Sequence, residues 1–413
     1  MSETKDYWSC AQQQYRAGEL DKALSCLAQI LQQTPDDVPA LFLSGMAQFQ
    51  SRNWTEALVP MIRAQELAPD RVDILSNLGS MYCEMGLFDK AALSFRHATE
   101  LAQNEPMNLA IVKFNEALLN FYRTPLSQWS DIAQQYEHYF SNAPAYAYEV
   151  CVRGALPLWA EGKGEALIKR LALANSHLSR LAPEAVKAMR NAYVYHRILL
   201  RLIQEEPLSP ATNSAKLIAV IGDSHLLSYC GVMLDIDGPH HCVASHLIVG
   251  AKAYHLGQEG KTNKFKEAFI NACQTLRSGS QCLLCFGEID CRADEGILYH
   301  SRKYKQNMPD VAEACATRYV HLAASLLKER NITPIFTTVP EPYFKELRLT
   351  IEVETVLKDT VLCYNAALRS ESARQGGCLL LDLYALTEGK NGSCHLDARH
   401  LKPAALCGLT VSR

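Results

Sequence analysis

The chain has 413 residues, of which 48% are hydrophobic and 21% charged, and its formal net charge is −3. This composition is typical of a folded globular protein, and a chain of this length usually divides into two or three domains. The small net charge disfavours nucleic acid as a partner, and no apolar run approaches the roughly 20 residues that span a bilayer. We therefore expect neither a nucleic-acid nor a membrane partner.

The N-terminal residues, MSETKDYWSC, contain no basic segment followed by an apolar one, so no secretory signal is predicted. The 15 cysteines are then expected to be reduced thiols of a cytoplasmic protein. Cys282 and Cys285 have C-x-x-C spacing, but they lie in an apolar run that is typical of a buried strand. Residues three apart on a strand face opposite sides, so this pair is expected to pack in the core.

Small residues and prolines recur at intervals of 34 residues in the first part of the chain. The matching positions are Ala23, Ala57 and Ala91, then Pro35 and Pro69, then Gly45 and Gly79. This period predicts repeated pairs of antiparallel helices, with a small residue where two helices cross and a proline after the second helix.

The third unit has the most complete set of repeat positions, namely Leu75, Leu78, Gly79, Tyr82, Gly86, Ala91, Phe95 and Ala98. These residues resemble the signature of the tetratricopeptide repeat (TPR) family, so we assign a TPR-like α-solenoid to residues 1–106. Residues 107–206 keep a helical pattern without the period and are expected to be degenerate repeats and a cap. The resemblance implies a surface that binds a protein partner. The alternative is that these helices only pack on the rest of the chain.

Residues 207–215 contain proline and small polar residues and are predicted to be a linker. Residues 216–413 then alternate predicted helices with predicted strands, which are LIAVIG, QCLLCF, ITPIFTTVP and CLLLDLY. Strict alternation predicts a parallel sheet that is covered by helices on both faces. In such folds the functional residues collect at the carboxyl ends of the strands.

Three residues near predicted strand ends can together perform nucleophilic catalysis. Ser224 follows the first strand, while Asp397 and His400 lie near the end of the chain. A serine hydroxyl needs a base within hydrogen-bond reach, which His400 would supply. Asp397 would fix the tautomer of His400 and stabilise its protonated form.

Two short blocks, Gly-Asp-Ser-His at 222–225 and Asp-x-x-His at 397–400, resemble the SGNH, or GDSL-type, hydrolase and acyltransferase family. The resemblance covers residues 216–413 and implies an α/β/α sandwich with a serine-dependent site and no cofactor or metal. Asp223 belongs to the first block. The backbone N–H of Ser224 is one expected donor to the oxyanion, and the family's glycine donor is matched best by Gly250.

A further family block, Gly-x-Asn-Asp, is altered in this chain, because Ile289 stands where the family has asparagine. Gly287 and Asp290 match, but an isoleucine cannot donate a hydrogen bond to the oxyanion. One lost donor lowers the rate on the order of 100- to 1000-fold. Either another donor replaces it, with Arg292 the best candidate, or the reaction is slow and directed to a special acceptor, or the domain is inactive.

The expected activity is acyl-ester chemistry on an acylated carbohydrate or another small-molecule ester, by hydrolysis or by O-acyl transfer to a hydroxylated acceptor. A transferase would need an acyl donor such as a coenzyme A thioester, for which the sequence shows no site. Histidines crowd residues 225–255, but no helical pair with a carboxylate third ligand predicts a metal site. The alternative function is a non-catalytic TPR scaffold with an inactive C-terminal domain.

Overall fold

The computed structural model describes residues 2–204, 216–345, 347 and 349–412. The chain forms two compact units, Met1–Leu119 and Asn120–Arg413. The predicted linker at 207–215 lies outside the described residues. Among the described helices, none has the length and apolar character needed to cross a membrane.

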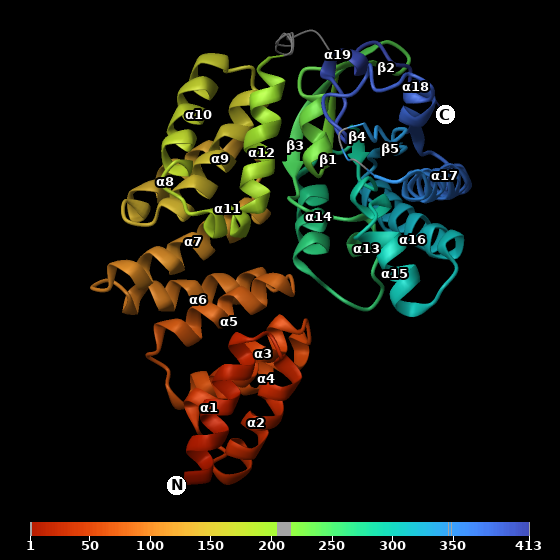
Figure 1. Cartoon of the computed structure of the whole chain (residues 1–413). Coiled ribbons are helices and arrows are strands. Elements are labelled where there is room, and N and C mark those ends of the chain that lie inside the picture. The colour runs from red at the N-terminus through yellow and green to blue at the C-terminus, as the bar shows by residue number, and fades with distance from the viewer. Residues whose placement is uncertain (1, 205–215, 346, 348, 413) are drawn as a thin grey trace. The chain divides into compact units, whose positions relative to one another are not determined.

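The first unit consists of paired helices (Figure 1). They are α1 (Ser2–Arg16), α2 (Leu20–Gln33), α3 (Val38–Gln50), α4 (Trp54–Leu67), α5 (Val72–Glu84) and α6 (Phe88–Leu101), followed by α7 (Pro106–Arg123). α1 packs on α2, α3 on α4 and α5 on α6, so each repeat of the sequence forms one hairpin of helices. The prediction of a TPR-like helical solenoid is confirmed for this unit.

The recurring residues pack as the period predicts. Ala23, Ala57 and Ala91 lie in the second helices of the three hairpins and are completely buried. α2 and α4 each end shortly before a proline of the repeat, Pro35 and Pro69 respectively. Small side chains therefore permit close helix packing, and the prolines follow the helix ends because their rings do not fit inside a helix.

Gly79 in α5 marks a close helix crossing, because a Cβ atom there would lie 2.5 Å from the ring of Phe95 in α6. Phe95 is only 1% exposed, so its ring has little room to move. We expect Gly79→Ala to lower the free energy of unfolding of the first unit by about 1–3 kcal/mol. Thermal unfolding measures the loss, with Gly164→Ala as the control, because a Cβ there meets no atom within 4 Å. Equal losses in both variants would contradict the crossing role of Gly79.

The second unit begins with helices and continues with a sheet domain. The helices are α8 (Trp129–Glu137), α9 (Pro144–Ala160), α10 (Gly164–Leu178), α11 (Pro183–Ala188) and α12 (Arg190–Leu202), with the 3-10 helices η1 (Leu126–Gln128) and η2 (His138–Phe140). α9 packs on α8, α10 and α12. By its contacts this segment, which was expected to be a helical continuation or degenerate repeats and a cap, belongs from Asn120 onward to the same compact unit as the sheet.

Six strands form one mixed sheet in the order β2-β3-β1-β4-β5-β6. They are β1 (Lys216–Gly222), β2 (Met233–Asp235), β3 (Pro239–Leu247), β4 (Gln281–Cys285), β5 (Thr333–Thr337) and β6 (Leu379–Leu381). Five strands are parallel as predicted, but β2 pairs antiparallel with β3 at the edge. Only a short turn, with Gly238 at a φ of +115°, joins β2 to β3, and such a turn can connect only antiparallel neighbours.

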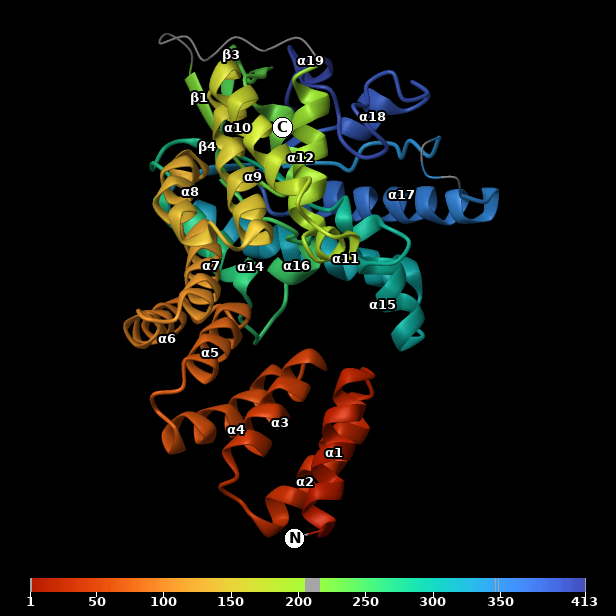
Figure 2. The same ribbon diagram turned by 60° about the vertical axis from the view of Figure 1, so that its left-hand side comes forward.

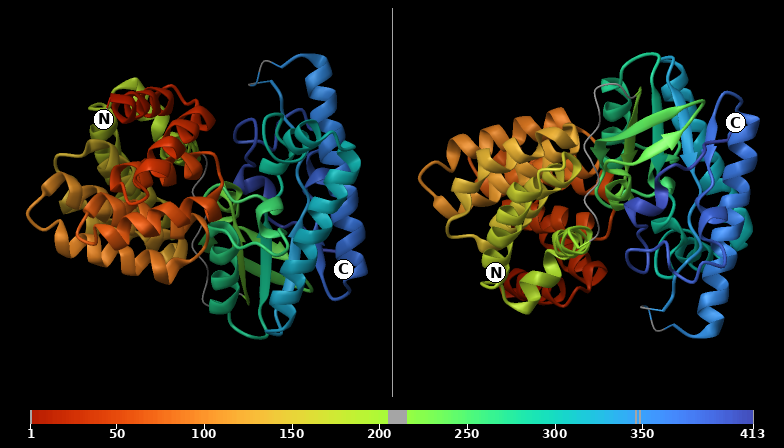
Figure 3. Two further views of the ribbon diagram at one scale, coloured as in Figure 1. Left: turned by 90° about the horizontal axis from the view of Figure 1, so that it is seen from below. Right: turned by 90° about the horizontal axis from the view of Figure 1, so that it is seen from above.

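Helices connect β3 to β4, β4 to β5 and β5 to β6, and two more follow β6. They are α13 (Ala253–Leu256), α14 (Lys264–Thr275), α15 (Gly296–Tyr304), α16 (Met308–Lys328), α17 (Ile351–Arg374), α18 (Leu383–Thr387) and α19 (Pro403–Leu406). The long helices α16 and α17 lie side by side (Figure 2), and α17 is the long blue helix of Figure 3. All fifteen cysteines are free, and Cys282 and Cys285 are buried in β4, as predicted.

Candidate active site

The structure brings Ser224, Asp397 and His400 together. Ser224 begins η3 (Ser224–Tyr229), directly after the strand β1, and the other two residues lie in the turn before α19. The Oγ atom of Ser224 is 2.9 Å from Nε2 of His400, and Nδ1 of His400 is 3.0 Å from each carboxylate oxygen of Asp397. At these distances His400 can accept the hydroxyl proton while Asp397 holds its ring.

Asp397 is fixed by its own turn. One of its oxygens accepts the backbone N–H groups of Arg399 and His400, each at 2.8 Å. Burial raises the pKa of Asp397, but the hydrogen bonds from His400 and from the turn outweigh burial and hold the pKa well below its usual range. The carboxylate therefore stays ionised at neutral pH and keeps accepting the proton on Nδ1 of His400.

A second Asp–His pair lies beside the first. Asp223 is completely buried, and its Oδ1 accepts the backbone N–H of His225 at 2.9 Å and contacts its ring Nδ1 at 2.7 Å. Nε2 of His225 is 3.2 Å from the backbone oxygen of Arg399, and its ring stacks on that of His400 with centroids 4.6 Å apart. His225 was not among the predicted site residues, although it directly follows Ser224 in the chain.

Both ring nitrogens of His225 face hydrogen-bond acceptors, a carboxylate oxygen at Nδ1 and a carbonyl oxygen at Nε2. Neither acceptor can donate, so both contacts are hydrogen bonds only when both ring nitrogens carry protons. Burial lowers the pKa of His225, but Asp223 and Glu288 outweigh burial and raise it above its usual value. His225 therefore links the nucleophile turn to the Asp397–His400 turn through these two contacts.

Glu288, Arg292 and Arg399 form a charged cluster next to His225. Nε and Nη2 of Arg292 donate to Oε2 of Glu288 at 2.9 and 2.5 Å. Burial raises the pKa of Glu288, but the cations Arg292, His225 and Arg399 outweigh burial and lower it to about 2. Two of the three guanidinium nitrogens of Arg292 are thus committed to Glu288, which leaves little capacity for its predicted role as the replacement oxyanion donor.

Gly250 lies in the turn after β3, with a φ of +74°. Within that turn, Ile248 donates its N–H to the carbonyl of Gly222 at 2.8 Å. Gly222 ends β1 two residues before Ser224. The turn that contains Gly250 is therefore attached to the same end of the sheet as Ser224.

Asp290 follows β4 but does not face the site. It is completely buried, and its two oxygens accept the backbone N–H groups of Ala253 and Tyr254 at 2.7 and 3.0 Å. These amides begin α13, so Asp290 holds that helix in place. The prediction that Asp290 contacts the oxyanion or substrate is corrected, because backbone amides already occupy its carboxylate. Ile289 beside it is 7% exposed and packs in the core.

Removing the Asp290 carboxylate is expected to leave two buried N–H groups unpaired. We expect Asp290→Ala to lower the free energy of unfolding by about 2–4 kcal/mol, with the exposed Asp70→Ala as control. Burial raises the pKa of Asp290 from 3.8 to about 6, against the opposing effect of the two N–H donors. The folded state therefore binds this proton more tightly, and stability falls as the pH rises from about 4 to about 6.

Urea unfolding at pH 4.5 and pH 7 measures this effect. The difference in stability between the native protein and Asp290→Ala is expected to shrink between the two pH values, because only the native protein carries the titrating carboxyl. A difference that stays constant, or grows, would show that the buried carboxyl does not titrate in this range.

Helices α9 and α12 of the same unit also contact the site. Trp159 of α9 donates from Nε1 to the backbone oxygen of Leu227 in η3 at 3.1 Å. Arg201 of α12 donates to the backbone oxygen of Leu396, next to Asp397, at 3.3 Å. Ser224 itself is 8% exposed. The helical segment thus supports both turns that carry the three residues, a role that no periodic pattern in the sequence indicates.

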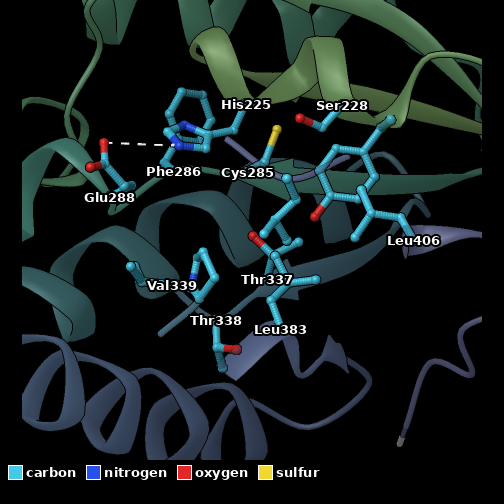
Figure 4. A pocket seen from close by; sticks show the side chains of 13 residues that line it. His225, Ser228, Cys285, Phe286, Glu288, Thr337, Thr338, Val339, Leu383 and Leu406 are labelled. Carbon is cyan, nitrogen blue, oxygen red and sulfur yellow. Dashed lines mark ion pairs between the residues drawn. The ribbon is translucent and has the colours of Figure 1, made fainter. Parts of the chain in front are cut away.

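Two hollows lie beside these residues. The smaller, shown in Figure 4, has a volume of about 20 Å³, or room for about one water molecule, and His225 and Glu288 face each other on its wall. The larger has a volume of about 290 Å³. Its lining combines the charged residues Glu288, Arg292, Asp294, Glu341 and Arg399 with His395 and with apolar residues such as Val339 and Phe344. Among the described residues, no group of three or more His, Cys, Asp or Glu side chains is placed so that it could hold a metal ion.

Comparisons with known proteins give no assignment for the C-terminal domain. No family model matches the chain, and no curated protein matches it. Among solved structures, MamA protein is 18% identical with a TM-score of 0.36, and the match covers 44% of this chain and 98% of MamA. Pseudomonas aeruginosa pilF is 15% identical with a TM-score of 0.35, covering 48% and 91%. The TPR-like assignment rests on the helix pairs of this chain itself.

Proposed function

We propose that the C-terminal domain is a serine-dependent acyl-ester hydrolase or O-acyltransferase of the SGNH, or GDSL, type. The observation that best supports this is the 2.9 Å contact between Oγ of Ser224 and Nε2 of His400, with Asp397 on the other ring nitrogen. This order of nucleophile, base and orienting carboxylate is what acyl transfer requires. The carboxyl ends of parallel strands are also where such folds place their functional residues.

In this mechanism Oγ of Ser224 attacks the acyl carbon while its proton moves to Nε2 of His400. The alcohol leaves with that proton, and the acyl group remains on Ser224 as an ester. Water or an acceptor hydroxyl then attacks this ester, and His400 takes its proton and returns it to Oγ of Ser224 as the acyl–Ser224 bond breaks. The N–H groups of Ser224 and Gly250 are the proposed oxyanion donors. With isoleucine at 289, a rate about 100- to 1000-fold below that of a site with a third donor is expected.

Hydrolysis of p-nitrophenyl acetate by the native protein and by Ser224→Ala tests the proposal. We expect release of p-nitrophenol that is lost in the variant, and labelling of the native protein by a fluorophosphonate at Ser224, located by peptide mass spectrometry. Hydrolysis that is unchanged in Ser224→Ala, or a label at another residue, would refute Ser224 as the nucleophile. Labelling of Ser224 by the fluorophosphonate does not depend on which acyl group the natural substrate carries.

A second function, protein binding by the first unit, is supported by an exposed apolar pair. Val59 in α4 and Leu93 in α6 are 71% and 63% exposed and occupy equivalent positions of neighbouring repeats. If a protein partner binds the native chain, we expect its binding to be lost when both residues are changed to lysine. If the fluorophosphonate fails to label Ser224 while such a partner is found, the non-catalytic scaffold becomes the better interpretation.

A further inference from the structure

The nucleophile turn is attached to helix α9. Nε1 of Trp159 donates to the backbone oxygen of Leu227 at 3.1 Å. Leu227 is 1% exposed and lies in η3, three residues after Ser224. The hydrogen bond therefore joins α9 to the backbone of this turn, and not to a side chain that can move by itself. It helps to fix the place at which η3 presents the hydroxyl of Ser224.

The turn that carries the proposed base is attached to helix α12. Nη1 of Arg201 donates to the backbone oxygen of Leu396 at 3.3 Å. The N–H of Leu396 donates to the carbonyl of His400 at 2.7 Å, and this bond closes the turn. Arg201 therefore holds the backbone at the point where the turn begins, and the position of His400 depends on it.

Helices α9 and α12 support each other. They pack together, and the hydroxyl of Tyr148 in α9 lies 3.0 Å from Nδ1 of His196 in α12. Both side chains are buried, Tyr148 completely and His196 with 2% exposed. Breaking a buried hydrogen bond leaves two polar groups unpaired, so this contact resists separation of the helices. The two donors to the turns therefore lie on one support.

Tyr195 of α12 lies between the same parts of the unit. Its side chain is 6% exposed, and burial raises the pKa of its hydroxyl. Asp223 of the nucleophile turn raises this pKa further, while Arg153 of α9 lowers it. The hydroxyl is thus close enough to α9 and to the nucleophile turn for their charges to act on it, as expected if α12 packs against both.

The separation of Ser224 from His400 depends on contacts between distant segments, because 176 positions lie between them in the chain. His225 joins the two turns directly. Trp159 and Arg201 join them a second time, through the helical segment. Proton transfer needs a hydrogen-bonded distance between nucleophile and base, and a displacement of about 1 Å lowers a rate on the order of 100-fold.

We infer that Trp159 and Arg201 are positioning residues for the proposed reaction, so that the catalytic unit includes the helices α9 to α12 and does not begin at β1. Each acts through the backbone of one turn and not on the reacting atoms. The effect of these residues on the rate rests on the proposed function, whereas their attachment to the turns does not. The alternative is that both hydrogen bonds only stabilise the fold.

Steady-state hydrolysis of p-nitrophenyl acetate by full-length variants tests the inference. Trp159→Phe and Arg201→Met each remove one donor, and each is expected to lower kcat about tenfold, with little change in KM. Arg201→Lys keeps a donor and is expected to recover part of the lost kcat. Trp54→Phe in the first unit and Arg197→Met, exposed on α12, are matched controls that are expected to keep the native kcat.

The variant with both changes shows whether the two donors act on one distance. Once one turn is released, release of the other has less effect, so the combined loss in kcat is expected to be smaller than the product of the single losses. Losses that multiply, or a fall in kcat that only matches the fraction of unfolded protein in urea titrations, would assign Trp159 and Arg201 a purely structural role and overturn the inference.

Hydrogen exchange of the Trp159 indole tests the attachment without activity. The chain has four tryptophans, so the indole signal that Trp159→Phe removes from a proton–nitrogen correlation spectrum identifies this N–H. It is expected to exchange at least about tenfold more slowly than the indole of free tryptophan. Arg201→Met is expected to speed its exchange, because both contacts belong to one support. Exchange of the native signal at the rate of free tryptophan overturns the inference.

These outcomes are separate from those of the test of the proposed function. Native kcat in both single variants overturns the inference and leaves the esterase intact. Absence of Ser224-dependent hydrolysis in the native protein removes the esterase and with it the effect on the rate, and the exchange measurement then decides the attachment of the turns alone.

Discussion

Replacing Asp397 with asparagine is expected to lower kcat for p-nitrophenyl acetate about a thousand- to ten-thousand-fold, with a smaller change in KM. The backbone N–H groups of Arg399 and His400 demand an acceptor, so they select the amide oxygen. The amide NH₂ then faces Nδ1 of His400. That nitrogen must become the acceptor, and the proton moves to Nε2, which can no longer take a proton from Ser224.

Steady-state kinetics of Asp397→Asn beside Asp359→Asn measure this effect. Asp359 lies exposed on α17, so its variant keeps the native rate if loss of one negative charge alone is harmless. Fluorophosphonate labelling should slow in parallel, because it depends on the same proton transfer. An Asp397→Asn protein with native kcat would show that Ser224, His400 and Asp397 do not act together in catalysis.

The sequence predicts the repeats well because their packing is local and periodic. Each hairpin buries the same small residue against its neighbour, so the spacing between Ala23, Ala57 and Ala91 records the geometry directly. The strands of the second unit are equally visible as apolar runs. The antiparallel edge strand β2 is not, because three residues, Met233–Asp235, are too few to show an alternating pattern.

The meeting of Ser224 with His400 could also be predicted, although 176 positions separate them. The carboxyl ends of parallel strands lie at one edge, and few turns at that edge carry both a nucleophile and a base. Asp290 was misplaced by the same reasoning. A carboxylate at a strand end is equally suited to cap a neighbouring helix, and only the positions of the Ala253 and Tyr254 amides distinguish the two uses.

Contacts between elements that lie far apart in the chain cannot be predicted from a single sequence. Trp159 and Arg201 look like ordinary helix residues, yet both donate to backbone oxygens beside the site. The ion pair of Arg292 with Glu288 is local, but it forms just after a strand, where a spacing of four residues predicts no particular geometry. Such contacts depend on how whole elements pack, which periodicity and motif spacing do not encode.

Replacing His225 with alanine is expected to lower kcat about 10- to 100-fold with little change in KM, a range typical of the loss of a group that orients a catalytic residue. In the native protein the ring of His225 contacts Asp223 on the nucleophile turn and the carbonyl of Arg399 on the other turn. Asp223 balances its charge, so the pair does not oppose protonation of His400. His225 thus acts as a positioning residue that keeps Oγ of Ser224 at the distance that proton transfer needs.

The pH dependence distinguishes this role from simple packing. The charged and titratable groups around His225 are Asp223, Glu288, Arg292, His395 and His400. Because the pKa of His225 is raised on folding, its double hydrogen bond is complete below the ordinary value of 6.5 and is lost as the pH rises through the raised value. The ratio of native to His225→Ala kcat is therefore expected to fall with rising pH.

His225→Asn and His225→Gln divide the effect between the two bonds. The shorter amide can keep the bond to Asp223, and the longer one can reach toward the carbonyl of Arg399, but neither carries a charge. If hydrogen bonding by His225 positions the two turns, kcat is expected to recover in part in either variant. Neither amide titrates, so this recovered kcat is expected to lack the pH-dependent step of the native protein. A ratio of rates that is independent of pH, with no recovery by either amide, would reduce His225 to a packing residue.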